Sequence, residues 1–251
     1  DYDMGWNLFS VPLELTWMFD KSDERYSELL VTQFRNVYDN DATPKPRYYI
    51  IPESVEKVGT VYADSETQTI NELGASYTKK YKYLRPGTYN YNTKNNMPML
   101  RLADIILCKA EILNELNGPT QEAIDLINQI RSRAFQDDTH NLSLAAYSSK
   151  DALRNAICDE RLLELNNEGV RRPDLIRMGL WKDRLNKYIA AIKVKSEWRQ
   201  KNSKDPNADY TSEWKVYPQD LTDNDIRRYF PVPKRELDLN PDLANCRSFS
   251  K

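Results

Sequence analysis

The sequence is poor in the residues on which many catalytic and metal sites depend. Its 251 residues include one histidine, His140, and three cysteines, Cys108, Cys158 and Cys246. A single histidine is a weak basis for a histidine-dependent triad or a zinc site, and the cysteines lack the spacing of metal ligands. No stretch has the ligand spacing of an EF-hand calcium loop. We therefore expect no metal and no cofactor.

Long apolar runs and a large excess of charge are also missing. No apolar run approaches the length of a membrane-spanning helix. The opening residues, Asp1-Tyr2-Asp3, lack the basic start of a secretory signal peptide, so we expect a processed or trimmed chain. The net charge is −2 and the isoelectric point is about 5.7. Because phosphate neutralisation needs a basic face, nucleic acid is not expected as a partner.

The residues that are present predict a folded protein with a polar surface. Apolar residues make up 40% and charged residues 29% of the chain. Sixteen tyrosines and five tryptophans outnumber six phenylalanines, so aromatic rings with a polar atom are in excess. Such rings suit wet surfaces that present flat apolar faces. Cys108 and Cys158 lie within apolar helical patterns, which favours buried free thiols, with a bridge between them as the alternative.

The clearest helical pattern lies in residues 99–116. Apolar residues recur there at helical spacing, at Leu100, Ala103, Leu107, Ala110 and Leu113. Gly118 and Pro119 end this helix, because glycine is favoured just after a helix and proline cannot continue one. A second helix is predicted over residues 121–134, with Ala123, Ile127 and Ile130 on one face. Two helices joined by a four-residue turn form a helical hairpin.

The same pattern recurs after a polar loop. Residues 149–168 predict a helix that carries Leu153, Ile157, Arg161, Glu164 and Leu165, and Gly169 ends it. A short helix follows up to Gly179, another covers about 181–200, and an extended tail closes the chain. Two hairpins in series suggest a tetratricopeptide-like stack. We therefore predict a mainly α fold of tetratricopeptide-like helical hairpins, with long loops and a few short strands.

The first hundred residues have weaker helical periodicity. Pro12 can open a short helix with Leu15, Met18 and Phe19 on its buried face. Trp17 lies off that face, and Trp6 precedes the helix. Residues 19–26 look like a turn, and residues 27–38 are compatible with either a strand or a helix. Residues 39–98 are rich in proline and tyrosine, and they predict long loops with short strands.

Opposite charges are concentrated in residues 160–179, ERLLELNNEGVRRPDLIRMG. Glu160, Arg161 and Glu164 are spaced to meet on one face of the predicted 149–168 helix. Arg171, Asp174 and Arg177 repeat the arrangement on the next helix. The two helices can interlock through arginine–carboxylate pairs, so we interpret the six residues as a structural ion-pair lattice. A catalytic carboxylate pair needs a cleft and an acid of raised pKa, and nothing in the spacing indicates a cleft.

Four segments of the sequence together carry a family resemblance. They are FDKSDERY (19–26), RLADIILCKAEILNELNGPTQEAIDLINQIRSRA (101–134), ERLLELNNEGVRRPDLIRMG (160–179) and YFPVPKRELDLNPDL (229–243). In this order they resemble segments of the SusD/RagB family of Bacteroidetes outer-membrane nutrient-binding lipoproteins. The sequence departs from the family pattern at Val170 and Arg172, where His and Trp are frequent, and at Cys108, where Met or Tyr is common.

The resemblance implies a domain organisation and a location. It implies one domain over residues 1–251, with a loop-rich ligand region at 19–98, a helical-repeat core at 99–179, and a helix with an extended tail at 180–251. Family members are usually longer and carry a lipidated cysteine in an amino-terminal part. The resemblance therefore implies a carboxy-terminal portion or a short member, anchored by lipid to the outer membrane at the cell surface in the full-length protein.

We expect a binding protein and not an enzyme. The resemblance implies that it binds an oligosaccharide or polysaccharide and delivers it to a SusC-like TonB-dependent transporter. Flat aromatic faces stack on sugar rings, and amides or charges bind the hydroxyl groups. The candidate ligand-binding residues are Tyr2, Trp6, Asn7, Trp17, Tyr48 and Tyr49, the last two in a proline-bounded loop. Ordinary packing is the alternative for each, and Trp181, Trp198 and Trp214 are expected in the core or an interface.

Three other functions stay open at this point. The helical hairpins could serve only to dock a partner, with the ligand site in a missing amino-terminal part. The nutrient could be a peptide instead of a glycan. A glycoside hydrolase would need two carboxylates roughly 5–10 Å apart across a cleft, but helix pairing and solubility already account for the acidic residues.

Overall fold

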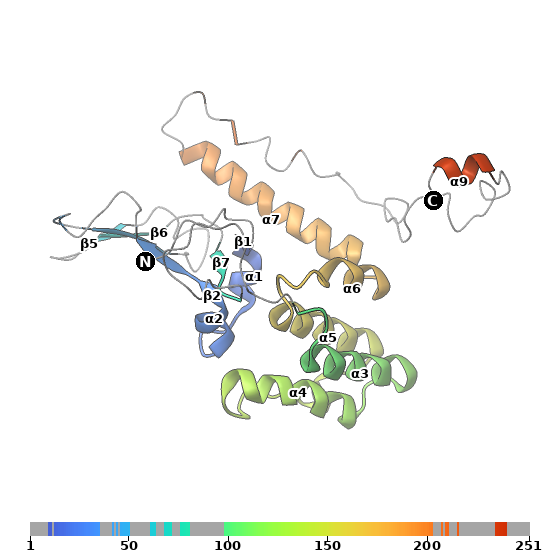
Figure 1. Ribbon diagram of the computed structural model, residues 1–251. Helices are drawn as coiled ribbons and strands as arrows, with labels where there is room; N and C mark the ends of the chain where they lie inside the picture. The colour runs from blue at the N-terminus through green and yellow to red at the C-terminus, as the bar shows by residue number, and fades with distance from the viewer. Residues whose placement is uncertain are drawn as a thin grey trace. The chain divides into compact units, whose positions relative to one another are not determined.

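The structure is a computed structural model of the 251-residue chain, shown in Figure 1. It describes residues 10–11, 13–35, 42, 44, 46–50, 61–63, 68–71, 76–80, 98–202, 207, 209–210, 215 and 234–239. The chain divides into two compact units, Asp1–Arg171 and Arg172–Lys251, and each is described by itself. None of the helices in the described ranges combines the length and the apolar character that a bilayer crossing requires.

A helical hairpin with a third helix beside it forms the main core of the first unit. Helices α3 (Leu102–Asn117) and α4 (Gln121–Phe135) pack against each other, and α5 (Lys150–Glu164) packs on α3 (Figure 1). The buried apolar side chains include Ala103, Leu107, Ala110, Ala123, Ile124, Ile127, Ile130, Leu153 and Ile157. The helical period predicted most of this list, and the predicted mainly α fold class is confirmed.

Local signals in the sequence set the ends of the hairpin. Gly118 has a φ of +80°, a conformation that favours glycine, and its N–H donates to the carbonyl of Asn114 at 2.8 Å. The Thr120 hydroxyl accepts the N–H of Ala123 at 3.2 Å and so caps the start of α4. The predicted turn between the two helices is confirmed. A short 3-10 helix, η2 (Leu144–Ala146), lies in the loop before α5.

Helix α5 ends four residues earlier than the pattern predicts. The predicted helix extends to residue 168, whereas α5 ends at Glu164. The carbonyl oxygen of Glu164 accepts hydrogen bonds from Arg101 at 2.6 Å and Lys80 at 2.7 Å. The last carbonyl groups of a helix have no N–H donor within the helix, and these two side chains supply donors for one of them. The chain then turns through Asn167, with a φ of +60°, before α6 (Arg171–Arg177).

Among the described residues of the first unit, short strands and two short helices precede the hairpin. One sheet has the order β1 (Ser10–Val11), β7 (Ser76–Thr78), β2 (Leu30–Val31), with antiparallel neighbours. The other has the order β3 (Gln33–Arg35), β4 (Arg47–Ile50), β6 (Gln68–Asn71), β5 (Val61–Ala63), in which β4 and β6 are parallel. The helices are α1 (Leu13–Met18) and α2 (Glu24–Leu29). Residues 27–38 therefore contain both helix and strand where described.

A second cluster of buried side chains joins this part to α5. Val11, Leu15, Phe19 and Leu30 pack with Leu163 of α5. Strand β7 continues into Lys79, whose N–H donates to the carbonyl of Leu29 at 2.7 Å. The backbone pairing beside β2 therefore places the next residue, Lys80, at the carboxyl end of α5, where it makes the contacts described below.

The described residues of the second unit include one long helix and two short ones. Its elements are α7 (Trp181–Asn202), α9 (Lys234–Leu239) and all of α6 except Arg171. Gly179 has a φ of +71° and, with Leu180, donates back to the carbonyls of Ile176 and Leu175. This pair of bonds is the Schellman arrangement at a helix end, so Gly179 ends α6 as predicted.

Three more local predictions are wrong. Leu100 was expected on the apolar face of the helix over residues 99–116, but it precedes α3 and is 65% exposed. Met18 was expected on the buried face of the first helix but is 38% exposed, whereas Thr16 is 3% exposed. A helix of six residues has fewer than two turns, so its period fixes the buried face poorly. The tail at 229–243 was expected to be extended, but α9 lies within it. The single domain over residues 1–251 stays a prediction.

The burial of α4 leads to a stability prediction. Ile127 is fully buried between the helices, so Ile127→Ala should lower the free energy of unfolding by about 2–5 kcal/mol, through lost apolar contact and the cavity left behind. Gln129→Ala, on the exposed side of the same helix, should change it by less than about 0.5 kcal/mol. Urea unfolding followed by circular dichroism measures both. Equal effects would contradict this packing.

Candidate functional site

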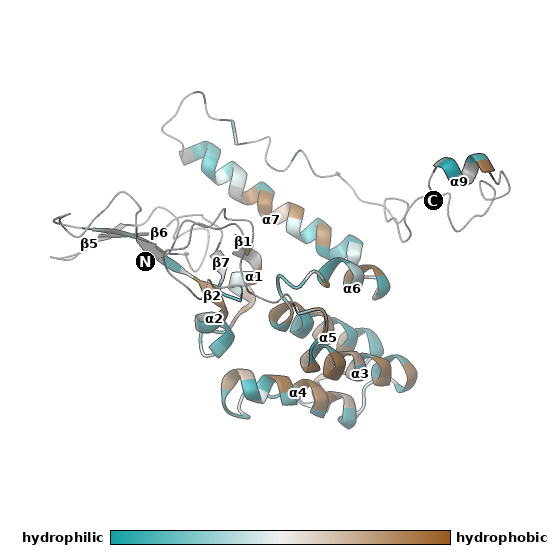
Figure 2. Cartoon of the chain, in the orientation of Figure 1, coloured by the Kyte–Doolittle hydropathy of each residue, from teal (hydrophilic) through white to brown (hydrophobic). Residues whose placement is uncertain are grey.

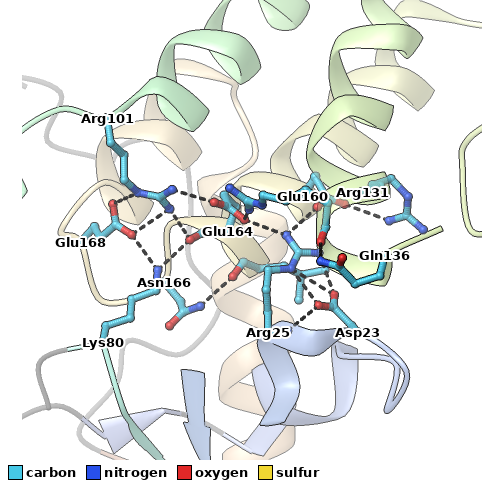
Figure 3. Close-up of polar contacts among 12 residues, drawn as sticks. Asp23, Arg25, Lys80, Arg101, Arg131, Gln136, Glu160, Glu164, Asn166 and Glu168 are labelled. Atoms are coloured by element: carbon cyan, nitrogen blue, oxygen red, sulfur yellow. Dashed lines mark hydrogen bonds and ion pairs between the residues drawn. The ribbon is translucent and has the colours of Figure 1, made fainter. Parts of the chain in front are cut away.

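A network of buried ion pairs surrounds the carboxyl half of α5. Its carboxylates are Asp23, Glu160, Glu164 and Glu168, and its cations are Arg25, Lys80, Arg101, Arg131 and Arg133. Figure 3 shows most of these side chains pointing toward one another from α2, α4, α5 and the segments before α3 and after β7. The network therefore connects parts of the chain that are distant in sequence.

Arg25 lies at one end of the network and is almost fully buried. Its Nη1 donates to Glu160 Oε1 at 2.7 Å and to Glu164 Oε2 at 3.1 Å. Its Nη2 and Nε donate to Asp23, which also caps α2 by accepting the N–H of Arg25. Asp23 therefore orients the guanidinium group that holds both glutamates of α5 (Figure 3).

Glu164 is the most connected carboxylate. Besides Arg25, it accepts from Arg133 Nη2 at 2.6 Å and from Arg101 Nη1 at 2.6 Å, and only 3% of its side chain is exposed. The neighbouring Glu160 also accepts from Arg131 Nη1 at 2.9 Å. Buried carboxylates need such partners, because an unpaired charge away from water is costly.

Glu168 and Lys80 close the other end of the network. Arg101 donates to both carboxylate oxygens of Glu168, from Nε at 2.8 Å and from Nη2 at 2.9 Å. Lys80 Nζ donates to Glu168 Oε1 at 2.6 Å and to the Glu164 carbonyl. Arg101 thus forms a bidentate pair with Glu168, and it also donates hydrogen bonds to the side chain and the carbonyl of Glu164.

The network changes the pKa values of its members. Burial alone would raise the pKa of Glu164, but hydrogen bonds and charges from Arg133 and Arg101 lower it from 4.5 to about 2. Glu168 behaves in the same way, and Arg101 and Lys80 lower its pKa. Burial lowers the pKa of Lys80, and its pair with Glu168 only partly opposes this. Glu164 and Glu168 are therefore held as carboxylates, unlike a general acid, which needs a raised pKa.

The six residues of the predicted lattice lie in different local settings. Glu160 and Glu164 belong to the network described above. Arg161 instead pairs with Asp104 of α3 at 2.7 Å and lies 3.3 Å from the Cys108 sulfur. Arg171 donates to the carbonyl of Cys158 at 2.9 Å. In the second unit, Asp174 and Arg177 pair with each other at 2.8 Å. The structural role of the six stays a proposal.

The described residues also locate the two predicted thiols and the histidine. Cys108 is half-buried and Cys158 is buried, and neither forms a disulfide with another described residue. The His140 ring stacks on Phe135 at 4.1 Å between ring centroids, and the Arg131 guanidinium lies over the same Phe135 ring. Among the residues that the structure describes, no group of three or more His, Cys, Asp or Glu side chains is arranged to hold a metal ion.

A pocket of about 570 Å³ lies beside the network. Its lining comprises Glu24, Arg25, Glu28, Leu29, Lys80, Pro98, Arg101, Arg133, Ala134, Gln136, Glu164 and Glu168. The four cationic side chains in this lining already pair with carboxylates. The pocket therefore offers a ligand little positive charge that is not already engaged, whereas its lining also includes the exposed carboxylates of Glu24 and Glu28.

Three of the six candidate ligand-binding residues lie within the described part of the chain. Trp17 lies on α1 and is 36% exposed. Tyr48 and Tyr49 lie in strand β4, paired with β3 and β6, so the prediction of a loop there is wrong. Tyr48 is half-buried. Tyrosine is common in β-strands, so these two residues indicated a strand, but the nearby prolines led to the prediction of a loop. Tyr2, Trp6 and Asn7 lie outside the described residues.

Two of the remaining tryptophans lie on α7. Trp181 and Trp198 are half-buried, and the Arg172 guanidinium lies 5.5 Å from the centroid of the Trp181 ring. A cation over an aromatic face is a stabilising contact. Trp214 lies outside the described residues.

Sequence reasoning missed most of the network. The missed residues are Asp23, Arg25, Lys80, Arg101, Arg131, Arg133 and Glu168. One signal was available, because Glu160, Glu164 and Glu168 recur every fourth residue beside buried leucines. Carboxylates on a buried helix side require cationic partners. The spacing could not say which arginines supply them, since Arg25 is 139 residues away from Glu164.

The comparisons with known proteins agree on one family. A family model described as the SusD family matches residues 13–247. SusD-like protein P2 of Formosa agariphila is 27% identical over 72% of this chain and 33% of its own length. SusD-like protein P38 of the same organism is 33% identical over 53% of this chain and 34% of its own length. The chain therefore spans about a third of the length of these curated relatives.

A solved structure shares the fold. The SusD homolog from Bacteroides thetaiotaomicron VPI-5482 matches 90% of this chain and 41% of its own length, with a TM-score of 0.56 and 24% identity. At this identity the match concerns the fold alone. Together with the family model, it confirms the resemblance to the SusD/RagB family.

Removal of the central carboxylate charge should destabilise the fold. Glu164→Gln keeps the shape but leaves Arg25, Arg101 and Arg133 without their shared charge. We expect a loss of roughly 3–5 kcal/mol in the free energy of unfolding at pH 7. The control is Glu122→Gln, since Glu122 pairs with Lys109 on the surface and should contribute at most about 1 kcal/mol. Similar urea midpoints for the two variants would contradict a central role for Glu164.

The lowered pKa of Glu164 predicts a pH dependence. A carboxyl group whose pKa falls on folding stabilises the protein above its unfolded pKa, and this contribution is lost as the pH falls toward the folded value. For Glu164 the window runs from 4.5 down to about 2. The stability difference between wild type and Glu164→Gln should therefore shrink between pH 7 and pH 3. A difference that stays constant across that range, measured by urea unfolding, would refute the assignment.

Proposed function

The chain belongs to the SusD family, and from that premise we propose that it binds a nutrient glycan at the cell surface and delivers it to a transporter. The nutrient is an oligosaccharide or polysaccharide, and the transporter is a SusC-like, TonB-dependent protein of the outer membrane. The single observation that supports this is the family match over residues 13–247. In the full-length protein a lipid anchor would hold it at the membrane.

Binding without catalysis fits the electrostatics of the charged cluster. A glycoside hydrolase needs one protonated acid near neutral pH and one carboxylate across a cleft. The environment of Glu164 and Glu168 lowers both pKa values, which favours two permanent carboxylates. Each also has arginine or lysine partners within hydrogen-bond distance. We therefore propose that this cluster is structural and that the protein is not an enzyme.

Trp17 is the described residue that best suits a sugar-stacking role. It lies on α1 with 36% of its surface exposed, while Leu15 and Phe19 of the same segment are buried in the core. The core side chains fix α1, and the indole ring is left partly accessible. A partly exposed, fixed aromatic ring loses little entropy when it stacks on a sugar ring. Tyr48 is a second candidate, and Tyr2, Trp6, Asn7 and Tyr49 stay predictions.

A docking role is the second candidate function. The chain spans 33% of SusD-like protein P2 and 41% of the solved SusD homolog, so a ligand site in a relative can lie outside the shared part. In that case the helical hairpins would serve as a platform for a partner. A peptide nutrient is a further alternative within the proposed binding function.

The first test is binding of the 251-residue chain to a panel of soluble polysaccharides, by affinity electrophoresis and then calorimetry. We expect retardation by one glycan class. Trp17→Ala and Trp6→Ala should each weaken binding about tenfold or more, since one stacked ring contributes about 1–3 kcal/mol. The matched control is Met18→Ala, which removes an equally exposed neighbour without a ring. Unchanged affinity in both tryptophan variants would reject these sites, and a folded chain that binds no glycan would favour the docking role.

A further inference from the structure

His140 is the only histidine of the chain, and it lies in the loop that follows α4. Its ring stacks on Phe135, the last residue of that helix, with 4.1 Å between the ring centroids and 5° between the ring planes. Arg131 Nε donates to the His140 carbonyl at 2.8 Å. The ring is therefore held against the end of α4, and because 35% of its side chain is exposed, it can exchange protons with water.

Within the described residues, the charged groups packed around this ring are Asp20, Asp137 and Arg131. His140 Nε2 lies 3.8 Å from Asp20 Oδ2, and Nδ1 lies 3.6 Å from Asp137 Oδ1. Asp137 belongs to the same loop, whereas Asp20 belongs to the turn between α1 and α2, and both segments consist mostly of hydrophilic residues, drawn in teal in Figure 2. The charge of Arg131 is already paired with Glu160 at 2.9 Å. A positive charge on the ring would therefore attract a carboxylate from a separate segment of the chain.

The hydrogen bonds of Thr139 determine which nitrogen gains that charge. The Thr139 hydroxyl donates its single proton to Asp137 Oδ1 at 2.8 Å. The same oxygen lies 2.9 Å from His140 Nδ1, so in this second contact it must accept. Nδ1 therefore carries the hydrogen of the neutral ring, because the hydrogen bond of one ring nitrogen fixes the tautomer. Nε2 is then the nitrogen that gains a proton, and it is the one that faces Asp20.

The carboxylate of Asp20 is fixed in the orientation that this contact needs. Its Oδ1 accepts the N–H of Ser22 at 2.8 Å and the hydroxyl of Ser22 at 2.7 Å, and Oδ2 faces the ring. These hydrogen bonds from Ser22 lower the pKa of Asp20, and hydrogen bonds from Thr139 lower the pKa of Asp137. An imidazole group ordinarily gains its proton near pH 6.5. Both aspartates are therefore charged throughout the pH range in which a histidine changes its charge.

We propose that His140 and Asp20 form a pH-dependent ion pair, which joins the loop after α4 to the turn between α1 and α2 when Nε2 is protonated. The neutral ring presents only a lone pair to the carboxylate, so the attraction is absent at higher pH. The contribution of the pair to stability is therefore present at pH 5.5 and lost as the pH rises to 8. Since both side chains are partly exposed, the effect should be a few-fold in the folding equilibrium. This device is independent of the proposed glycan function.

The position of the proton can be read directly by NMR. The 251-residue chain is made with 15N label and without a histidine tag, so that its one imidazole supplies all the ring-nitrogen signals of histidine. At pH 8 the proton should lie mainly on Nδ1, and at pH 5.5 both nitrogens should carry one. The same chain unfolded in urea is the reference, because neither nitrogen then has a fixed partner. A proton mainly on Nε2 in the folded chain at pH 8 would overturn the proposal.

A double-mutant cycle tests the ion pair itself. Asp20→Asn, His140→Gln and the combined variant are unfolded in urea at pH 5.5 and at pH 8. At pH 5.5, Asp20→Asn should lower the folding equilibrium constant about two- to fivefold more in the parent than in the His140→Gln background. At pH 8 the two backgrounds should lose the same amount.

The control cycle replaces Asp20→Asn by Glu122→Gln, a surface carboxylate in the first turn of α4, at the other end of that helix from His140. This cycle should show no coupling at either pH. A coupling between Asp20 and His140 that is equal at the two pH values, or larger at pH 8, would overturn the proposal. So would the absence of coupling at pH 5.5.

Discussion

The pairing of buried Glu164 with arginines from three separate segments is the interaction on which the first unit depends. Arg25 comes from α2, Arg101 from the residue before α3, and Arg133 from α4. A carboxylate that is 3% exposed is stable only with such partners, and each partner is itself partly desolvated by the arrangement. The position of α5 is therefore tied to the positions of three other elements at once.

This constraint involves three of the four segments that carry the family resemblance. The segment 19–26 supplies Asp23 and Arg25, the segment 101–134 supplies Arg101, Arg131 and Arg133, and the segment 160–179 supplies Glu160, Glu164 and Glu168. These segments are far apart along the chain, yet they meet in one network. A change of one member leaves buried charge on the others, so residue identity is restricted at all of these positions together.

The helices were predictable from the sequence because their signals are local. The apolar period of α3, α4 and α5 and the positions of Gly118, Thr120 and Gly179 depend only on neighbouring residues. The end of α5 was not predictable in this way. Arg101 and Lys80 bind the Glu164 carbonyl, and neither is near it in sequence. The same limit applies to the network, because helical spacing identifies side chains that share a face but cannot identify partners 29 to 139 residues away.

The division of roles between charged and aromatic residues bears on the proposed function. Ion pairs that are mutually satisfied make a rigid scaffold but leave little charge for a ligand, and this describes Glu160, Glu164 and Glu168 with their arginines. A neutral sugar needs stacking surfaces and hydrogen-bonding groups more than it needs net charge. A chain with 16 tyrosines and five tryptophans has many such surfaces to place on this scaffold. The network would then contribute to glycan binding indirectly, because it fixes α2 and the neighbouring strands against α5. Leu163 of α5 also packs with Leu15 and Phe19. This packing fixes α1, the helix that carries Trp17.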